Sequence, residues 1–118
     1  MELKMELQSI SSTTQLQEVL ARANNKTVVL DFTAEWCAPC KKIAPVLREL
    51  ATTFTANFDV FTVDVDAAHQ LVTHFKVTTM PTFVFLRNNR VIYVFKGASA
   101  DLLTQAFEII SSVTQPGV

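Results

Sequence analysis

The 118-residue sequence has little cysteine, no long apolar run and almost no net charge, and each absence excludes a class of protein. Two cysteines in a chain of this length do not make the disulfide framework of a small secreted domain. The 10 basic and 11 acidic residues nearly cancel, so the composition predicts no nucleic acid and no anionic membrane as partner. No apolar run approaches the roughly 20 residues of a membrane-spanning helix.

The first residues also lack the apolar segment of a secretory leader, and Glu2 and Glu6 stand where signal and transit peptides rarely carry acid. A reducing, cytoplasmic setting is therefore expected. The length and the 49% hydrophobic composition predict one domain over residues 1–118, with a core that needs no cross-links. Residues 1–6 are expected to form a loose extension and residues 114–118 a frayed end.

Both cysteines fall in residues 36–40, Trp-Cys-Ala-Pro-Cys, between a β-rich run at 27–33 and a helical pattern at 37–53. Residues three apart at the start of a helix share a face, so the sulfurs of Cys37 and Cys40 can meet the geometry of a disulfide. Cys37 would open the helix, where free N–H groups and the dipole favour an anion and lower the pKa of a thiol. Cys40, one turn further, is expected to be more buried and less reactive.

Three uses of this pair are open. A purely structural disulfide would close a ring so small that it restrains the unfolded chain little. A zinc site would need two further ligands, but there is no second cysteine pair, and His69 and His74 are five residues apart, a poor helical match. The sequence therefore predicts no metal site and favours redox chemistry, in which the pair opens and closes. Pro39 suits the first helical turn, where its missing N–H costs nothing.

Asp31 interrupts the apolar run at 27–33 and has two interpretations. It could be a polar residue at a strand end, exposed or capping. Alternatively, it is a buried carboxylate with a raised pKa, close behind the cysteine pair, and acts as general base for Cys40.

The remaining elements follow from the spacing of apolar residues, which repeats about every 3.6 residues in helices and forms β-branched runs in strands. Asn88-Asn89 tolerates positive φ and predicts a hairpin turn. The expected order is a short edge strand at 7–10, a helix to about 23, strands at 27–33 and 58–65 around a helix at 37–53 kinked by Pro45, a helix at 66–75, strands at 82–86 and 91–96, and a last helix capped by Ser99.

With these residues in view, the chain resembles the thioredoxin family over roughly residues 7–113. The resemblance rests on the segments Val28-Val29-Leu30-Asp31-Phe32, Ala34-Glu35-Trp36-Cys37-Ala38-Pro39-Cys40-Lys41, Ile43-Ala44-Pro45, Val63-Asp64-Val65-Asp66, Val77-Thr78-Thr79-Met80-Pro81-Thr82-Phe83 and Gly97-Ala98.

This resemblance implies an α/β thioredoxin fold, with a central five-stranded mixed sheet flanked by four helices. It also implies that the Met80-Pro81 bond is cis, and that the backbone at Met80 pairs with an extended substrate segment by strand addition. The substrate-binding residues it implies are Trp36, Ala38, Pro39, Thr79, Met80, Pro81, Gly97 and Ala98.

The implied activity is protein-disulfide reduction, in which the Cys37 thiolate attacks a partner disulfide and Cys40, helped by Asp31, resolves the mixed disulfide. No cofactor is implied beyond the redox-active disulfide, and a thioredoxin reductase or an equivalent reductant would recharge it, using NADPH only indirectly. A monomer is expected. Two alternatives stay open: an oxidase or isomerase, whose relatives usually carry His where Pro39 stands, and a non-catalytic binding subunit of the same fold.

The sequence departs from the family pattern at three informative positions. Ala38 replaces the usual Gly, which a first helical turn tolerates. Thr62 stands where bacterial members carry Lys, so Asp31 lacks a cation and a higher carboxyl pKa is expected. Asn89 replaces the Gly of the hairpin turn and can adopt the same backbone conformation.

Overall fold

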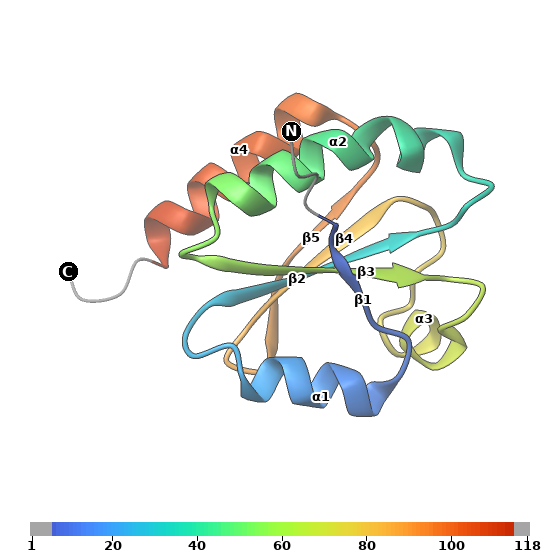
Figure 1. Cartoon of the computed structure of the whole chain (residues 1–118), viewed down its shortest axis with the longest axis horizontal. Helices are drawn as coiled ribbons and strands as arrows, with labels where there is room; N and C mark the ends of the chain where they lie inside the picture. Colours follow the sequence, from blue (N-terminus) through green and yellow to red (C-terminus); the bar gives the residue numbers. More distant parts are fainter. Residues whose placement is uncertain (1–5, 115–118) are drawn as a thin grey trace.

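The computed structural model describes residues 6–114, so the loose extension and the frayed end lie outside the described residues, except for Glu6 and Thr114. Helices and strands alternate along most of the chain (Figure 1). The elements are β1 (Gln8–Ser9), α1 (Thr13–Ala21), β2 (Thr27–Thr33), α2 (Ala38–Thr53), β3 (Phe58–Asp64), α3 (His69–His74), β4 (Thr82–Arg87), β5 (Arg90–Lys96) and α4 (Ala100–Val113).

The five strands form one mixed sheet in the order β1-β3-β2-β4-β5. β1, β3 and β2 are parallel, whereas β4 is antiparallel to β2 and β5 is antiparallel to β4. Figure 1 shows α2 and α4 on one face of the sheet and α1 and α3 on the other. The expected fold class, a five-stranded mixed sheet with four helices, is confirmed.

β2 lies at the centre of the sheet and is covered on both faces, which explains its unbroken apolar run. Side chains alternate between the faces of a strand. Val29 packs in the core beneath α2 and α4, whereas Val28 and Leu30 pack in the core beneath α1 and α3. Asp31 follows Val29 by two residues, so its carboxyl group lies on the α2 side of the sheet.

Turn and cap residues act as their chemistry predicts. Ser12 caps α1 and forms a capping box with Gln15, and Ser99 caps α4. Asn88 and Asn89 both have positive φ in the turn between β4 and β5, so the predicted hairpin is confirmed.

The helix predicted at residues 66–75 is wrong at its start, because α3 begins at His69. The backbone N–H of Asp66 donates to the Asp64 carboxylate at 3.0 Å, a local bond that favours a turn over a helix. Within residues 6–114, no helix has the length and apolar character to cross a membrane.

Candidate active site

Cys37 is the N-cap residue of α2, and its sulfur is bonded to that of Cys40. The two Cα atoms are 5.3 Å apart, within the usual range for a disulfide. The Cys37 Sγ also accepts a hydrogen bond from the backbone N–H of Cys40 at 3.3 Å. The sulfur therefore lies where the free N–H groups of α2 stabilise negative charge.

The two cysteines differ less in burial than the sequence predicts. Cys37 is 6% exposed and Cys40 4% exposed in the disulfide form. The difference between them is one of position, since Cys37 precedes the helix and Cys40 lies within its first turn. Both pack with Ala34 in a small apolar cluster against Val65 and Met80.

The Met80-Pro81 peptide bond is cis, as the family resemblance implies. The carbonyl oxygen of Met80 lies 3.8 Å from the Cys37 sulfur. Two hydrogen bonds hold this segment: Gly97 N–H donates to the Pro81 carbonyl at 3.0 Å, and Thr82 Oγ1 donates to the Thr79 carbonyl at 2.6 Å. These contacts bring three segments, distant in sequence, to one end of the sheet.

The residues expected to bind substrate differ in how much surface they present. The exposed ones are Trp36, Ala38, Pro39, Thr79 and Gly97, the partly exposed ones are Met80 and Ala98, and Pro81 is buried. The Pro81 ring therefore offers little surface to a partner.

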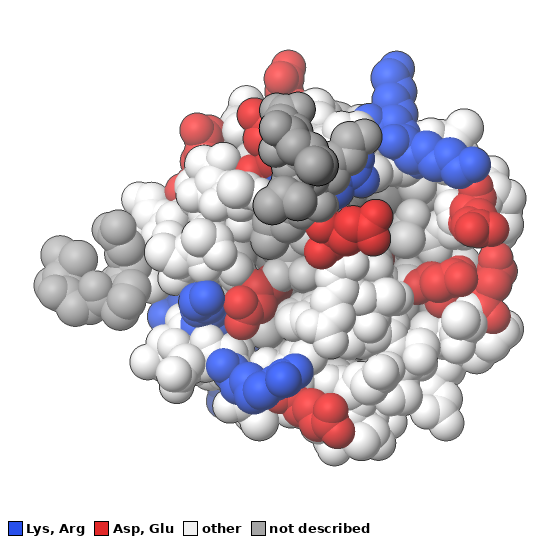
Figure 2. Space-filling view, viewed as in Figure 1, with Lys and Arg blue, Asp and Glu red and all other residues white. Residues whose placement is uncertain are grey.

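Trp36 is 65% exposed, yet its ring is held in place. The indole Nε1–H donates to the Asp66 carboxylate at 2.8 Å. Sequence reasoning missed this role of Asp66, and the only signal was an acidic residue just after a predicted strand. Glu35 and Asp64 line the same shallow hollow beside the indole, and Figure 2 shows acidic side chains gathered at this end of the molecule.

Asp31 is buried, with 5% of its surface exposed. Its Oδ1 atom has no hydrogen-bond partner among the described residues. Burial raises the pKa of the carboxyl group from 3.8 to about 7. The structure therefore supports the buried carboxylate and excludes the exposed strand-end interpretation. Thr62 lies opposite Asp31 in the register of β2 and β3, at the position where the sequence predicts no cation.

A cleft of about 360 Å³ leads to Asp31 from the side of the molecule on which β1 and β3 lie. Ala44, one helical turn beyond Cys40, lines this cleft together with Asp31, so Asp31 lies beneath the part of α2 that follows the cysteine pair. The sequence could not reveal this cleft, because its walls come from four separate segments. The lining residues are Glu6, Leu7, Asp31, Ala44, Leu47, Arg48 and Thr62.

Over the described part of the chain, no three His, Cys, Asp or Glu side chains are grouped as metal ligands. The site combines a sulfur–sulfur bond at a helix N-terminus, a backbone carbonyl 3.8 Å from the Cys37 sulfur and a buried carboxyl group with a raised pKa. Such a site can exchange disulfides with another protein.

Comparisons with known proteins agree with this chemistry. The thioredoxin family model matches residues 8–108. Thioredoxin-1 of Drosophila yakuba is 41% identical over 81% of this chain and 90% of its own, and thioredoxin H5 of Arabidopsis thaliana is 44% identical over 72% and 71%. The crystal structure of Deadhead, a germline-specific thioredoxin of Drosophila melanogaster, superposes with a TM-score of 0.83, at 36% identity, over 88% of this chain and 99% of that one.

The solved relative shares the fold, and the bonded pair Cys37–Cys40 is consistent with the paired-cysteine active site of this family. The protein is accordingly a thiol–disulfide oxidoreductase that reduces protein disulfides, and neither alternative is favoured. The chain belongs to the thioredoxin family.

Proposed function

We propose that this protein reduces partner disulfides with Cys37 as the attacking thiol and Cys40 as the resolving thiol. The single observation that carries this assignment is the position of the Cys37 sulfur at the N-terminus of α2, in contact with the N–H of Cys40. A thiolate is stabilised at that position, and the thiolate is the nucleophile in disulfide exchange.

The exchange balances in two steps. The Cys37 thiolate attacks one sulfur of a partner disulfide, so a mixed disulfide forms and the other partner sulfur leaves as a thiolate. The Cys40 thiolate then attacks the Cys37 sulfur, so the mixed disulfide breaks and the Cys37–Cys40 bond forms. Two electrons pass to the partner, and the two thiol protons of the reduced protein end on the partner sulfurs or in solvent.

Asp31 is proposed as the general base that removes the proton from Cys40 in the second step. Its pKa of about 7 lets the carboxylate take a proton near neutral pH, where an ordinary Asp would already be too weak a base. Its place in the cleft that Ala44 also lines, one helical turn past Cys40, supports this role. Asp31 acts on Cys40 rather than on Cys37, because Cys37 already has the helix N-terminus.

Partner proteins are proposed to dock as an extended segment along the backbone of Met80. The carbonyl of Met80 lies 3.8 Å from the Cys37 sulfur, so a segment paired there brings its own sulfur into reach. The proposed contact residues are Trp36, Ala38, Pro39, Thr79, Met80, Pro81, Gly97 and Ala98.

All proposed catalytic groups come from one chain, so one chain is the catalytic unit. No bound cofactor is required, and the disulfide is proposed to be recharged by a thioredoxin reductase or an equivalent reductant, in which NADPH would serve the reductase. Electron transfer of this kind fits a reducing, cytoplasmic setting, which we propose from the cysteine content.

Insulin reduction tests the activity, and two single variants test the roles. Cys37→Ser should abolish turnover, whereas Cys40→Ser should attack once and remain as a stable mixed disulfide, visible by mass spectrometry under non-reducing conditions. Trapping on the Cys37→Ser variant instead would reverse the two roles. A measured reduction potential well above the range of thioredoxins would favour the oxidase alternative.

A further inference from the structure

Away from the redox site, exposed apolar side chains gather on β5 and α4. Eight large apolar side chains of the described residues are exposed, and all but Trp36 lie on these two elements. Ile109 is 61% exposed and Val113 is 75% exposed. Large apolar surfaces of this kind mark sites of association.

Val91 and Val94 pair with Leu86 and Val84 of the core beneath α1 and α3, so their side chains lie on the face of the sheet away from α4. The patch on the α4 side is therefore Ile92, Tyr93, Leu102, Ile109 and Val113.

The patch contains both a ridge and a groove. Leu102, Ile109 and Val113 are spaced seven and four residues apart, so they form one stripe along α4. Beside this stripe lies a groove of about 480 Å³ between α4 and β5, and Arg87 is its only charged lining residue in the described chain. A surface with a ridge next to a groove can match a second copy of itself about a two-fold axis.

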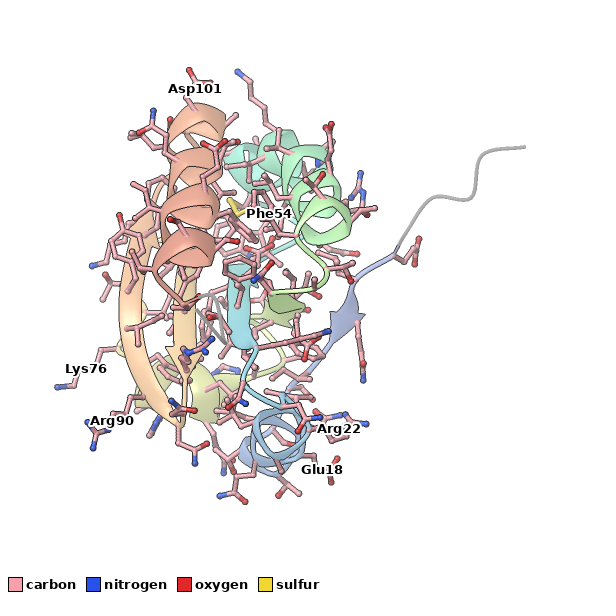
Figure 3. All side chains as sticks on the ribbon, turned by 90° about the vertical axis from the view of Figure 1, so that its left-hand side faces the viewer. Glu18, Arg22, Phe54, Lys76, Arg90 and Asp101 are labelled. Atoms are coloured by element: carbon pink, nitrogen blue, oxygen red, sulfur yellow. A yellow bond between two sulfur atoms is a disulfide. The ribbon has the colours of Figure 1, made fainter. Side chains whose placement is uncertain are left out.

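The charges of the two elements are opposite. The charged residues of β5 are Arg90 and Lys96, both basic and exposed, and those of α4 are Asp101 and Glu108, both acidic and exposed. At about 3.6 residues per turn, Asp101 and Glu108 lie on the side of α4 opposite its buried residues. Figure 3 shows Asp101 and Arg90 at opposite ends of the molecule.

We propose that two copies of this chain associate through this patch, with the α4 helices antiparallel and the ridge of each in the groove of the other. Each α4 then packs on its own sheet with one side and faces the partner's β5 with the other, acidic side. The antiparallel direction brings the partner's Asp101 towards Arg90, which pairs with the groove residue Arg87. Lys96 pairs with Thr82 on the other face of the sheet, so it takes no part in the contact.

Direct pairing of the two β5 edges does not account for the patch. β5 is an edge strand, but its register with β4 slips at Phe85 and Leu86, which leaves Ile92 without a partner residue. Such a bulge protects an edge from strand addition. An antiparallel self-pair centred on Tyr93 would also place Arg90 against Lys96, two like charges. The groove is therefore the favoured contact.

The proposed interface shares no residue with the proposed docking residues around Cys37. Association through it therefore leaves each redox site open, and the activity per chain should not depend on it. The expectation of a monomer then holds only at low protein concentration.

Sedimentation velocity of the full-length reduced protein, from about 10 µM to about 1 mM, tests the association. We expect a monomer–dimer equilibrium that Ile109→Glu weakens at least about tenfold. Gln70→Glu, which adds the same charge at an exposed position of α3, should leave the monomer–dimer equilibrium unchanged. Normal insulin reduction by both variants shows that they are folded and separates this outcome from any failure of the redox assignment.

A charge swap tests the antiparallel arrangement. Arg90→Glu and Asp101→Lys should each weaken dimerisation, and the double variant should restore it. On dilution of the wild-type protein, amide NMR shifts should change at Ile92, Tyr93, Ile109 and Val113. A monomer throughout, changes centred on Trp36, an unaffected Ile109→Glu dimer or a swap that fails to restore association would each overturn the proposal.

Discussion

The redox end and the β5–α4 patch both expose apolar surface, but they are built differently. At the redox end one large side chain, Trp36, is exposed, and a hydrogen bond to Asp66 fixes it. A cis peptide bond and a backbone carbonyl lie beside the sulfurs. The patch has five exposed aliphatic or aromatic side chains, on a regular helix and a bulged edge strand. The apolar area of the β5–α4 patch favours stable association with another protein. The fixed backbone beside the sulfurs favours a brief contact in which disulfides exchange.

The largest expected effect is on the rate of insulin reduction, which should depend on the redox end and not on the β5–α4 patch. Cys37→Ser should lower the rate of insulin reduction by at least about a thousandfold, because the nucleophile is lost. Ile109→Glu, in the other region, should leave the rate per chain within about twofold. Equal losses in both variants would show that the two regions are not independent.

The second effect concerns stability at the redox end. The folded pKa of Asp31 is about 7 against an ordinary 3.8, so the unfolded chain releases this proton first as the pH rises. The contribution of Asp31 to the free energy of unfolding should therefore be most favourable below about pH 4. It should fall by up to about 4 kcal/mol as the pH rises through about 7.

Asp31→Asn removes that charge, and it should raise the unfolding free energy of the oxidised protein above pH 7 while changing it little near pH 4. Urea unfolding at both pH values measures this difference. If the gain is the same at both pH values, ionisation of Asp31 is not its cause.

The third effect is on the rate of the resolving step. Without a carboxylate under Cys40, Asp31→Asn should slow resolution about a hundredfold near pH 7. The wild-type rate should rise with pH through about 7 as Asp31 ionises, and the variant should lack that rise. Single-turnover release of a trapped peptide disulfide measures it, and Thr62→Val, which keeps the acid, is the control. An unchanged pH profile in Asp31→Asn would remove Asp31 from the mechanism.

The smallest expected effect comes from the hydrogen bond that fixes the Trp36 indole, a restraint that the β5–α4 patch lacks among the described residues. Asp66→Ala frees the Trp36 indole, so kcat/KM for insulin should fall about threefold to tenfold, with little loss of stability at this exposed site. Indole fluorescence anisotropy should fall as well. Glu35→Ala, which removes a carboxylate from the same hollow but leaves the bonds of Asp66 in place, is the matched control.

Much of this structure could be predicted because its signals are local. The β-branched run of β2 and the apolar spacing of α2 gave their bounds to within one residue, and the two asparagines gave the hairpin. The burial of Asp31 is one of two interpretations that the sequence leaves open, and the structure decides for it because β2 is covered on both faces.

The remainder depends on contacts between distant segments. The helix predicted from residue 66 failed because the Asp64 side chain accepts the Asp66 N–H, and the bond from Trp36 to Asp66 joins residues thirty apart. Likewise, the cleft at Asp31 and the groove beside Ile109 exist only once several elements are packed.

The most direct test of the central claim is the alkylation rate of each thiol in the reduced protein. Iodoacetamide labelling from about pH 5 to about pH 9, with the labelled site resolved by mass spectrometry, gives both rates. We expect Cys37 to react first and, near neutral pH, faster than free cysteine, with Cys40 following slowly. Equal rates at the two positions, neither exceeding that of free cysteine, would contradict the assignment of Cys37 as an activated nucleophile at the start of α2.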